Sequence, residues 1–221
     1  MSFFEVWAAG GLAVLIYMTL IWLVSVIKRD ASIVDIFWGL GFVVLSVVYF
    51  ILAEDGYSGR KILILALVGV WGLRLSGHIL ARNWGKEEDP RYQNFRRRYG
   101  KGYWWISFFQ VFLLQGAIMW LISATLLAAH YFDAPDNLTP LDILGAMLWI
   151  IGIFFEAVGD WHLKRFKANP ANAGQVLDSG VWSYTRHPNY FGDAAQWWAY
   201  FLIALSSGWG ALTIFGPTLM T

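Results

Sequence analysis

Seven polar residues with chemically useful side chains lie inside apolar stretches of this chain. They are Asp35, Arg74, His78, Glu156, Asp160, Asn189 and Asp193. Polar and ionisable groups are costly in hydrocarbon, so we treat them as candidates for a functional site. Several share a four-residue spacing, which places them on one face of a helix. We expect these faces and Asp35 to converge on one pocket. Alternatively, Asp35 or Glu156 pairs with Arg74 merely to fix helix packing.

A basic segment precedes the last two of these residues. Pro188 suits the first turn of a helix, where no amide hydrogen is needed, so Arg186 and His187 stand at a helix N-terminus. The free amide hydrogens and the positive end of the helix dipole attract anions. With Lys164 and Lys167 nearby, the pattern predicts a phosphate site at the membrane surface. Alternatively, it is an ordinary basic loop that touches anionic lipid.

Composition indicates which class of protein must position these residues. Of the 221 residues, 58% are apolar or aromatic and 14% are charged, against about 25% charged in soluble domains. This balance excludes a soluble globular protein. The absence of Cys excludes thiolate nucleophiles and Cys-ligated metals. The four histidines lie on separate segments without a His-Glu-x-x-His motif, so we predict no metal site. A net charge of +1 gives no indication of nucleic-acid binding.

Six apolar runs are long enough to cross about 30 Å of hydrocarbon as helices, which takes roughly 20 residues. They are residues 5–27, 32–53, 62–81, 106–130, 141–163 and 188–206. A seventh run begins near Gly208 and stops at Thr221, and we expect this helix to be cut short. The first run lacks a small-residue cleavage site, so we interpret it as a spanning helix. We therefore predict an all-α fold, a polytopic transmembrane bundle of seven helices in a single domain, residues 1–221.

Basic residues between the runs indicate the orientation of the bundle. Lys and Arg are concentrated after the first, third and fifth runs, whereas Arg60 and Lys61 are the basic residues of the opposite side. Cytoplasmic loops carry the excess of Lys and Arg. We therefore place the N-terminus outside and the candidate site at the cytosolic side of an integral membrane protein. Topology alone is a sufficient explanation for most of these charges.

Four blocks of the sequence together resemble the steroid 5α-reductase C-terminal-like superfamily, in particular its bacterial branch. The most specific block is Tyr184-Thr-Arg-His-Pro-Asn-Tyr-Phe-Gly-Asp193. The others, in chain order, are Asp35-Ile-Phe-Trp-Gly-Leu-Gly-Phe42, Asp89-Pro-Arg-Tyr92 and Gly159-Asp-Trp-His-Leu-Lys-Arg-Phe-Lys167. The resemblance covers nearly the whole chain. Arg-His-Pro-x-Tyr also occurs in the related isoprenylcysteine carboxyl methyltransferases.

This resemblance implies a membrane reductase that binds NADPH in a cytosol-facing cavity of its later helices, approximately residues 141–221. It also implies reduction of an activated carbon–carbon double bond in a steroid-like or other lipid substrate. The resemblance and the expected phosphate site together give the cofactor-binding candidates: Glu156, Asp160, Lys164, Lys167, Tyr184, Arg186, His187, Asn189, Tyr190 and Asp193. The chain departs from the steroid enzymes at Glu156, where they carry Asn, and it lacks their Gln-Glu pair on the second helix. The substrate therefore stays open.

The implied reaction assigns roles to three further residues. Hydride transfer to a polarised alkene puts negative charge on its carbonyl oxygen, which a hydrogen-bond donor must stabilise. Asp35 and His78 are our catalytic candidates, and Arg74 would set the local field or pair with Asp35. No Gly-x-Gly-x-x-Gly lies between a strand and a helix, so a Rossmann cofactor domain is excluded.

Two other functions fit the same sequence. The chain could be an S-adenosylmethionine-dependent membrane methyltransferase, since the related methyltransferases hold their cofactor beside the same Arg-His-Pro segment. It could also be a non-enzymatic lipid-binding membrane protein. All three functions have membrane lipids as partners, and the sequence leaves the oligomeric state open.

Overall fold

The structure is a computed structural model that describes residues 1–221, and it contains helices without strands. The long helices are α1 (Phe3–Lys28), α2 (Ile33–Leu52), α3 (Ser58–Asn83), α8 (Pro140–Ala168) and α9 (Pro188–Leu205). The shorter helices are α4 (Pro90–Tyr99), η1 (Gly100–Gly102), α5 (Tyr103–Ser107), the π-helix η2 (Phe108–Leu113), α6 (Leu114–Ile122), α7 (Ala124–Tyr131), η3 (Pro170–Asn172), η4 (Gly180–Ser183), η5 (Trp209–Thr213) and α10 (Phe215–Met220).

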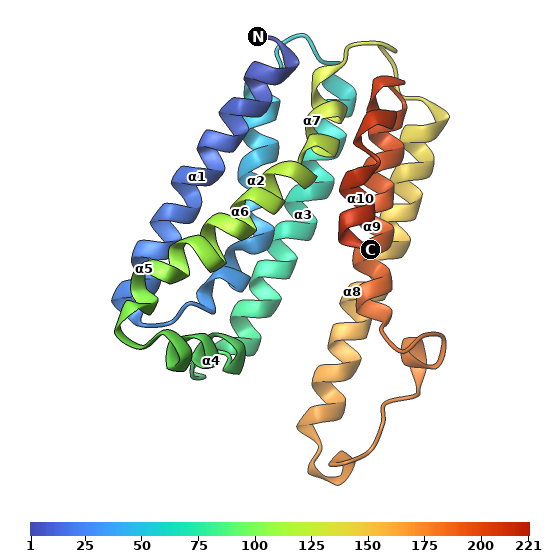
Figure 1. Ribbon diagram of the computed structural model, residues 1–221. Helices are drawn as coiled ribbons and strands as arrows, with labels where there is room; N and C mark the ends of the chain where they lie inside the picture. Colours follow the sequence, from blue (N-terminus) through green and yellow to red (C-terminus); the bar gives the residue numbers. More distant parts are fainter.

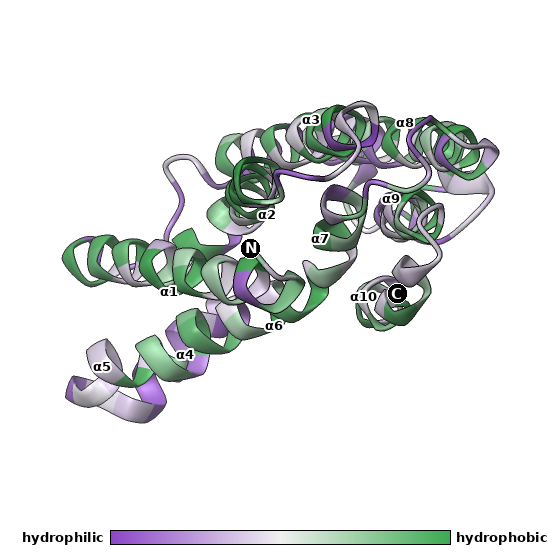
Figure 2. Cartoon of the chain, turned by 90° about the horizontal axis from the view of Figure 1, so that it is seen from above, coloured by the Kyte–Doolittle hydropathy of each residue, from purple (hydrophilic) through white to green (hydrophobic).

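Five helical segments are long and apolar enough to cross a membrane. They are α1, α2, α3, the continuous stretch Pro90–Tyr131 and α8. The predicted all-helical membrane bundle is confirmed. The sixth predicted run is α9, which is 18 residues long, and the seventh forms the short helices η5 and α10. Figure 2 shows the apolar residues distributed along the helices and the hydrophilic ones concentrated in the connecting segments.

The helices form two groups that meet around α9. Helices α1, α2, α3, α6 and α7 make one group, and α8, α9 and α10 make the other (Figure 1). Helix α9 packs along α8 and also contacts α7 and α3. Buried aromatic rings fill the junction: Trp197 of α9 lies 4.8 Å from Phe42 of α2 and 5.6 Å from Trp71 of α3, between ring centroids. This cluster fixes α9 relative to both groups.

Glycine allows the close approach of α8 and α9. A Cβ atom on Gly152 would lie 2.7 Å from the backbone oxygen of Gly192, and one on Gly192 would clash with the backbone of α8 in turn. Small residues at helix contacts let backbones approach closely in membranes. This contact brings Glu156 and Asp160, the next polar residues of α8, against the first turns of α9.

The predicted loop alternation is present in the fold. The α1–α2 turn, the α3–α4 connection and segment 169–187 all lie at the lower end of the bundle in Figure 1, and the N-terminus lies at the upper end. We call the lower end the basic end, because it carries the Lys- and Arg-rich connections. The candidate site residues lie in this half of the bundle.

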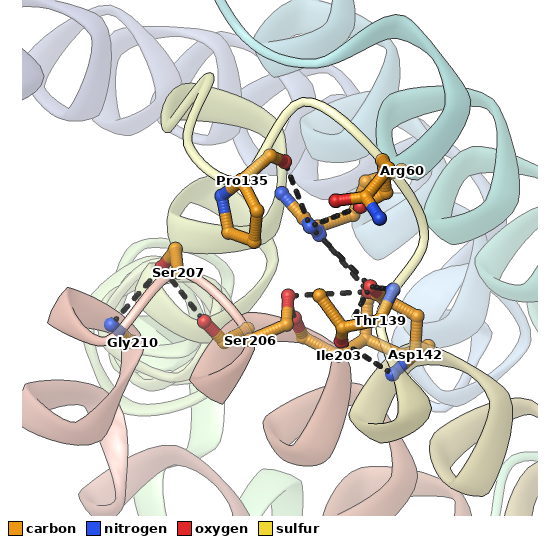
Figure 3. A network of polar contacts seen from close by, with 10 residues as sticks. Arg60, Pro135, Thr139, Asp142, Ile203, Ser206, Ser207 and Gly210 are labelled. Atoms are coloured by element: carbon orange, nitrogen blue, oxygen red, sulfur yellow. Dashed lines mark hydrogen bonds and ion pairs between the residues drawn. The ribbon is translucent and has the colours of Figure 1, made fainter.

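A buried ion pair joins α3, α8 and α9 at the opposite end (Figure 3). The Arg60 guanidinium donates to both carboxylate oxygens of Asp142, at 2.9 and 3.3 Å, and both side chains are fully buried. Thr139 and Ser206 also donate to Asp142, at 2.9 and 3.2 Å. We call these four residues the Arg60–Asp142 cluster. Because Asp142 has a partner for each oxygen, the cluster clamps this end of the bundle.

Candidate functional site

Arg74 lies at the centre of the polar residues at the basic end. Its guanidinium donates to the carboxylates of Glu156 and Asp160, which stand one turn apart on α8. It also donates to the backbone oxygen of Glu156, at 3.2 Å. The three side chains are 20%, 5% and 11% exposed. The pairing of Arg74 with Glu156, which the alternative interpretation named, is therefore present, whereas pairing with Asp35 is wrong.

Helix α9 completes this cluster. Asn189 donates to Asp160 at 3.2 Å, and Gln196 donates to Glu156 at 2.6 Å. His78 of α3 lies 3.6 Å from the other Asp160 oxygen. The four-residue spacings on α3 and α8 therefore do face each other, as we expected. Gln196 was missed, although a lone amide in an apolar helix three residues after Asp193 is the signal that indicates it. We call Arg74, Glu156, Asp160, Asn189 and Gln196 the Arg74–Asp160 cluster.

A cavity of about 200 Å³ lies beside the Arg74–Asp160 cluster. Its polar lining consists of His78, Arg82, Glu156, Asp160, Asn189, Tyr190 and Asp193. Trp38 and Trp71 form apolar walls. The Trp71 indole N–H and the Asn189 amide oxygen are buried and have no hydrogen-bond partner. Buried polar atoms are nearly always paired, so the Asn189 oxygen offers an acceptor to a polar ligand, and the Trp71 N–H, which has the Asp193 carboxyl as its neighbour, offers a donor.

A second hollow, of about 770 Å³, lies on the basic side of the cavity. It separates the end of α8 from segment 169–187, and its charged and imidazole side chains are those of Lys167, Asp178, Arg186 and His187. The His187 ring stacks on Tyr190 with centroids 5.1 Å apart, and Tyr190 lines the cavity. The two hollows therefore have neighbouring walls at the start of α9. We call the second hollow the basic groove.

Not every predicted cofactor residue reaches these hollows. Lys164 is exposed and Tyr184 is 82% exposed, and neither lines the cavity or the basic groove. Tyr184 lies in the segment between η4 and α9, which Trp182 fastens to α8 by donating to the Gly159 oxygen at 3.1 Å. The fastened loop leaves the Tyr184 ring on the surface.

Asp35 belongs to a separate cluster, so the expectation that it shares a pocket with Arg74 and His78 is wrong. The Tyr92 hydroxyl and the Arg91 guanidinium each donate to its carboxylate at 2.8 Å. The physical reason is that α4 lies over the start of α2 and supplies both partners. Tyr92 was missed as a partner, although the block Asp89-Pro-Arg-Tyr92 marked its position.

The sequence model of one protein family matches residues 21–221. Its description is "Protein of unknown function (DUF1295)". The matched residues include every element around the cavity and the basic groove. The likeness to the steroid 5α-reductase superfamily is thereby shown for nearly the whole chain.

Curated relatives match shorter segments. A delta(14)-sterol reductase of Gibberella zeae is 32% identical over 42% of this chain and 22% of its own length. A 3-oxo-5-alpha-steroid 4-dehydrogenase 1 of Bos taurus is 32% identical over 32% of the chain and 28% of its own length. A probable O-methyltransferase of Ustilaginoidea virens is 32% identical over 33% of the chain and 26% of its own length. The chain thus covers about a quarter of each relative's length. No solved structure matches.

Proposed function

The chain belongs to the DUF1295 family of steroid 5α-reductase-like membrane proteins, and we propose that it is an NADPH-dependent reductase of an activated carbon–carbon double bond in a lipid-like substrate. One observation carries the proposal. A cavity with an unpaired donor and an unpaired acceptor lies next to a groove with two cations, Lys167 and Arg186, at the start of α9. A long ligand with a polar ring at one end and phosphates at the other suits this shape.

The side chains of the two hollows fit NADPH. Lys167 and Arg186 supply cations for phosphate oxygens, and the first amides of the 18-residue helix α9 supply donors. The Trp71 N–H and the Asn189 amide oxygen match the acceptor and the donor of a carboxamide such as that of nicotinamide. The bound cofactor would supply the hydride, while the chain binds, orients and excludes water.

The residues of the Arg74–Asp160 cluster orient this site. Arg74 is absent from the cavity wall, so it is a positioning residue. Its guanidinium donates to one carboxylate oxygen of Asp160, and the Asn189 amide donates to the other oxygen. His78 lines the cavity and is the catalytic candidate for donating a hydrogen bond to the substrate oxygen. Asp35 would act, if at all, through Tyr92, which donates to it.

The cavity walls favour an apolar substrate. Trp38, Leu75, Ile79 and Met220 line it, and the matched relatives include a sterol reductase and a steroid dehydrogenase. A lipid-like molecule with a polarised alkene fits these walls. The excess of Lys and Arg at the basic end supports a cytosolic orientation of the groove in a bacterial inner membrane.

A test measures the thermal midpoint of the detergent-purified chain with NADPH, NADH or S-adenosylmethionine. A ligand at 100 times its Kd adds about 2.7 kcal/mol of apparent stability. We expect stabilisation by NADPH, and a Kd at least tenfold weaker in Asn189→Ala, because one charge-neutral hydrogen bond contributes about 0.5–1.5 kcal/mol and Asn189 also orients Asp160. The matched control is Asn137→Ala, an exposed asparagine at the opposite end of the bundle.

The same measurement decides between the proposed function and its alternatives. The probable O-methyltransferase relative makes methyl transfer the second candidate. S-adenosylmethionine carries no phosphate, and its single carboxylate would give Lys167 and Arg186 fewer anionic oxygens than the phosphates of NADPH. Stabilisation by S-adenosylmethionine alone would therefore replace the reductase with a methyltransferase. No response to any of the three ligands would favour a non-enzymatic lipid-binding protein.

A further inference from the structure

A further cationic hollow lies at the basic end, between the end of α1 and the α4–α5 segment. It has a volume of about 760 Å³, and its walls include Ser25, Arg29, Arg96, Lys101, Tyr103 and Trp104. No Asp or Glu lines it. None of its residues lines the cavity or the basic groove of the proposed cofactor site. We call it the α1–α5 groove.

The Tyr103 hydroxyl is an unsatisfied group in the wall of this groove. The side chain is 1% exposed, and its oxygen is buried without a hydrogen-bond partner. The other buried hydroxyls of the wall, Ser25 and Ser107, each donate to a backbone oxygen of their own helical segment. Because buried hydroxyls are normally paired, Tyr103 indicates a ligand oxygen that accepts its hydrogen.

Two cations of the groove have no carboxylate partner. Glu88 binds Arg96 through two hydrogen bonds, at 2.8 and 2.9 Å, and the Arg96 guanidinium lies 4.8 Å from the centroid of the Tyr103 ring. Arg96 therefore orients Tyr103 while its own charge is neutralised. Arg29 and Lys101 form no ion pair, so their charges are available to an anion.

Arg29 occupies a backbone position that favours glycine. It follows α1 with φ 54° and ψ 38°, the left-handed conformation, and it is the only residue other than glycine with a positive φ. Its N–H donates to backbone oxygens of the last turn, the arrangement in which Gly usually ends a helix. An arginine there costs conformational energy that a glycine would not. A charged side chain that binds an anion would offset this cost.

The groove lies where lipid headgroups meet the protein. Trp22 of α1 donates to the Trp104 oxygen at 2.8 Å, and the two rings stack. Trp104 is 54% exposed, and tryptophan is enriched at membrane interfaces. Further along α1, the contact of this helix with η2 and α6 holds an apolar hollow of about 380 Å³, lined by Leu15, Met18, Phe108 and Phe112 among others, which offers a surface for acyl chains. A free phosphate would use only the cationic part of this surface.

We propose that the α1–α5 groove binds the headgroup of an anionic phospholipid. Arg29 and Lys101 hold its phosphate, the Tyr103 hydroxyl donates to a phosphate oxygen, and the acyl chains lie along the apolar hollow between α1 and η2. This site is independent of the proposed reductase activity, because it shares no residue with the cofactor hollows.

The test measures the thermal midpoint of the detergent-purified full chain with added short-chain phosphatidylglycerol, phosphatidylcholine of the same chain length, or inorganic phosphate. We expect phosphatidylglycerol to raise the midpoint by about 5 °C at 100 times its Kd. Phosphatidylcholine and inorganic phosphate should raise it by less than a quarter of that shift. The effect should fall with added salt, because exposed charges are screened.

Variants separate the ligand site from a structural role. Arg29→Gly removes the charge and suits the left-handed backbone, so we expect the lipid-free midpoint to stay or rise while phosphatidylglycerol affinity falls at least tenfold. Tyr103→Phe should also weaken binding without lowering the midpoint, because it removes an unpaired hydroxyl. Lys28→Ala, which deletes the neighbouring exposed cation outside the groove, is the matched control and should keep full binding.

Three outcomes would overturn the proposal. Equal shifts with phosphatidylglycerol and phosphatidylcholine would show that the groove does not select an anionic headgroup. An equal shift with inorganic phosphate would assign it to free phosphate. Undiminished phosphatidylglycerol binding by Arg29→Gly and Tyr103→Phe would place the lipid elsewhere.

Discussion

Two polar clusters join α3 to α8, one at each end of the bundle, and they use the same residue types. Arg60 pairs with Asp142 at one end, and Arg74 pairs with Glu156 at the other. The second pair lies fourteen positions further along both helices, about 21 Å at 1.5 Å per residue. Both pairs therefore hold the two helices side by side, at two depths of the membrane.

The two clusters differ in how completely their polar atoms are satisfied. In the Arg60–Asp142 cluster each Asp142 oxygen accepts hydrogen bonds, both members of the pair are fully buried, and one atom, Arg60 Nη1, is buried without a partner. Around Arg74, the oxygens of Asn189 and Gln196 and the Trp71 N–H are buried without partners, and a 200 Å³ cavity lies alongside. The same kind of ion pair therefore closes a helix contact at one end of the bundle and borders a cavity at the other.

The largest loss of stability should come from breaking the Arg60–Asp142 cluster. Asp142→Ala leaves the buried Arg60 charge without its carboxylate, which costs about 3–5 kcal/mol of stability. The free energy of unfolding in mixed detergent micelles measures this loss. The double variant Arg60→Met with Asp142→Leu should recover most of it, because well-packed apolar residues replace a buried ion pair at little cost. Weakened NADPH binding by the double variant would contradict a purely structural role.

Breaking the Arg74–Asp160 cluster should lower stability less than Asp142→Ala does, and it should weaken NADPH binding more. Arg74→Met removes the partner of two carboxylates, yet Arg74 is 20% exposed and water can enter the neighbouring cavity. We expect a loss of about 1–3 kcal/mol and a Kd for NADPH at least tenfold weaker. Arg74→Lys should restore part of the stability but little binding, because a lysine cannot fork between two carboxylates. A loss equal to that of Asp142→Ala with unchanged NADPH binding would erase the difference between the clusters.

The Arg74–Asp160 cluster was more predictable from the sequence than the Arg60–Asp142 cluster. Arg74 and His78, like Glu156 and Asp160, stand one helical turn apart in apolar runs, so their burial and shared faces followed from spacing alone. Arg60 was interpreted only as a topology charge, and Asp142 was not singled out, because each lies near a helix start where charged residues are ordinary. Their pairing joins positions 82 residues apart, and helix periodicity carries no information on such contacts.

Asp35 and the fourth apolar run show the same limit. The depth of Asp35 in its helix was predictable, but its partners come from α4. The position of α4 depends in turn on the Glu88 carboxylate, which accepts from the Ala31 N–H of the α1–α2 turn at 2.7 Å. The run over residues 106–130 was predicted as one helix, whereas it contains a π-helical turn at Phe108–Leu113 and a junction at Ser123. Apolar composition does not distinguish these geometries, because both bury the same side chains.

The smallest effect on stability should come from the more exposed ion cluster of Asp35, Asp89 and Arg91. Asp89 caps α4 and accepts from the Arg91 guanidinium at 2.9 Å, and this hydrogen bond lowers the pKa of Asp89. A carboxyl whose pKa is lowered by folding stabilises the fold above its unfolded pKa of about 3.9, and this stabilisation is lost as pH falls through the folded pKa.

Asp89→Asn keeps a good helix cap, so the variant should be slightly less stable than the parent at pH 7. The difference in thermal midpoint between parent and variant should shrink as the pH falls from 5 toward 3, with Asp136→Asn in the exposed opposite loop as the control. A difference that stays constant over this range would mean that Asp89 acts as a cap alone, without its charge.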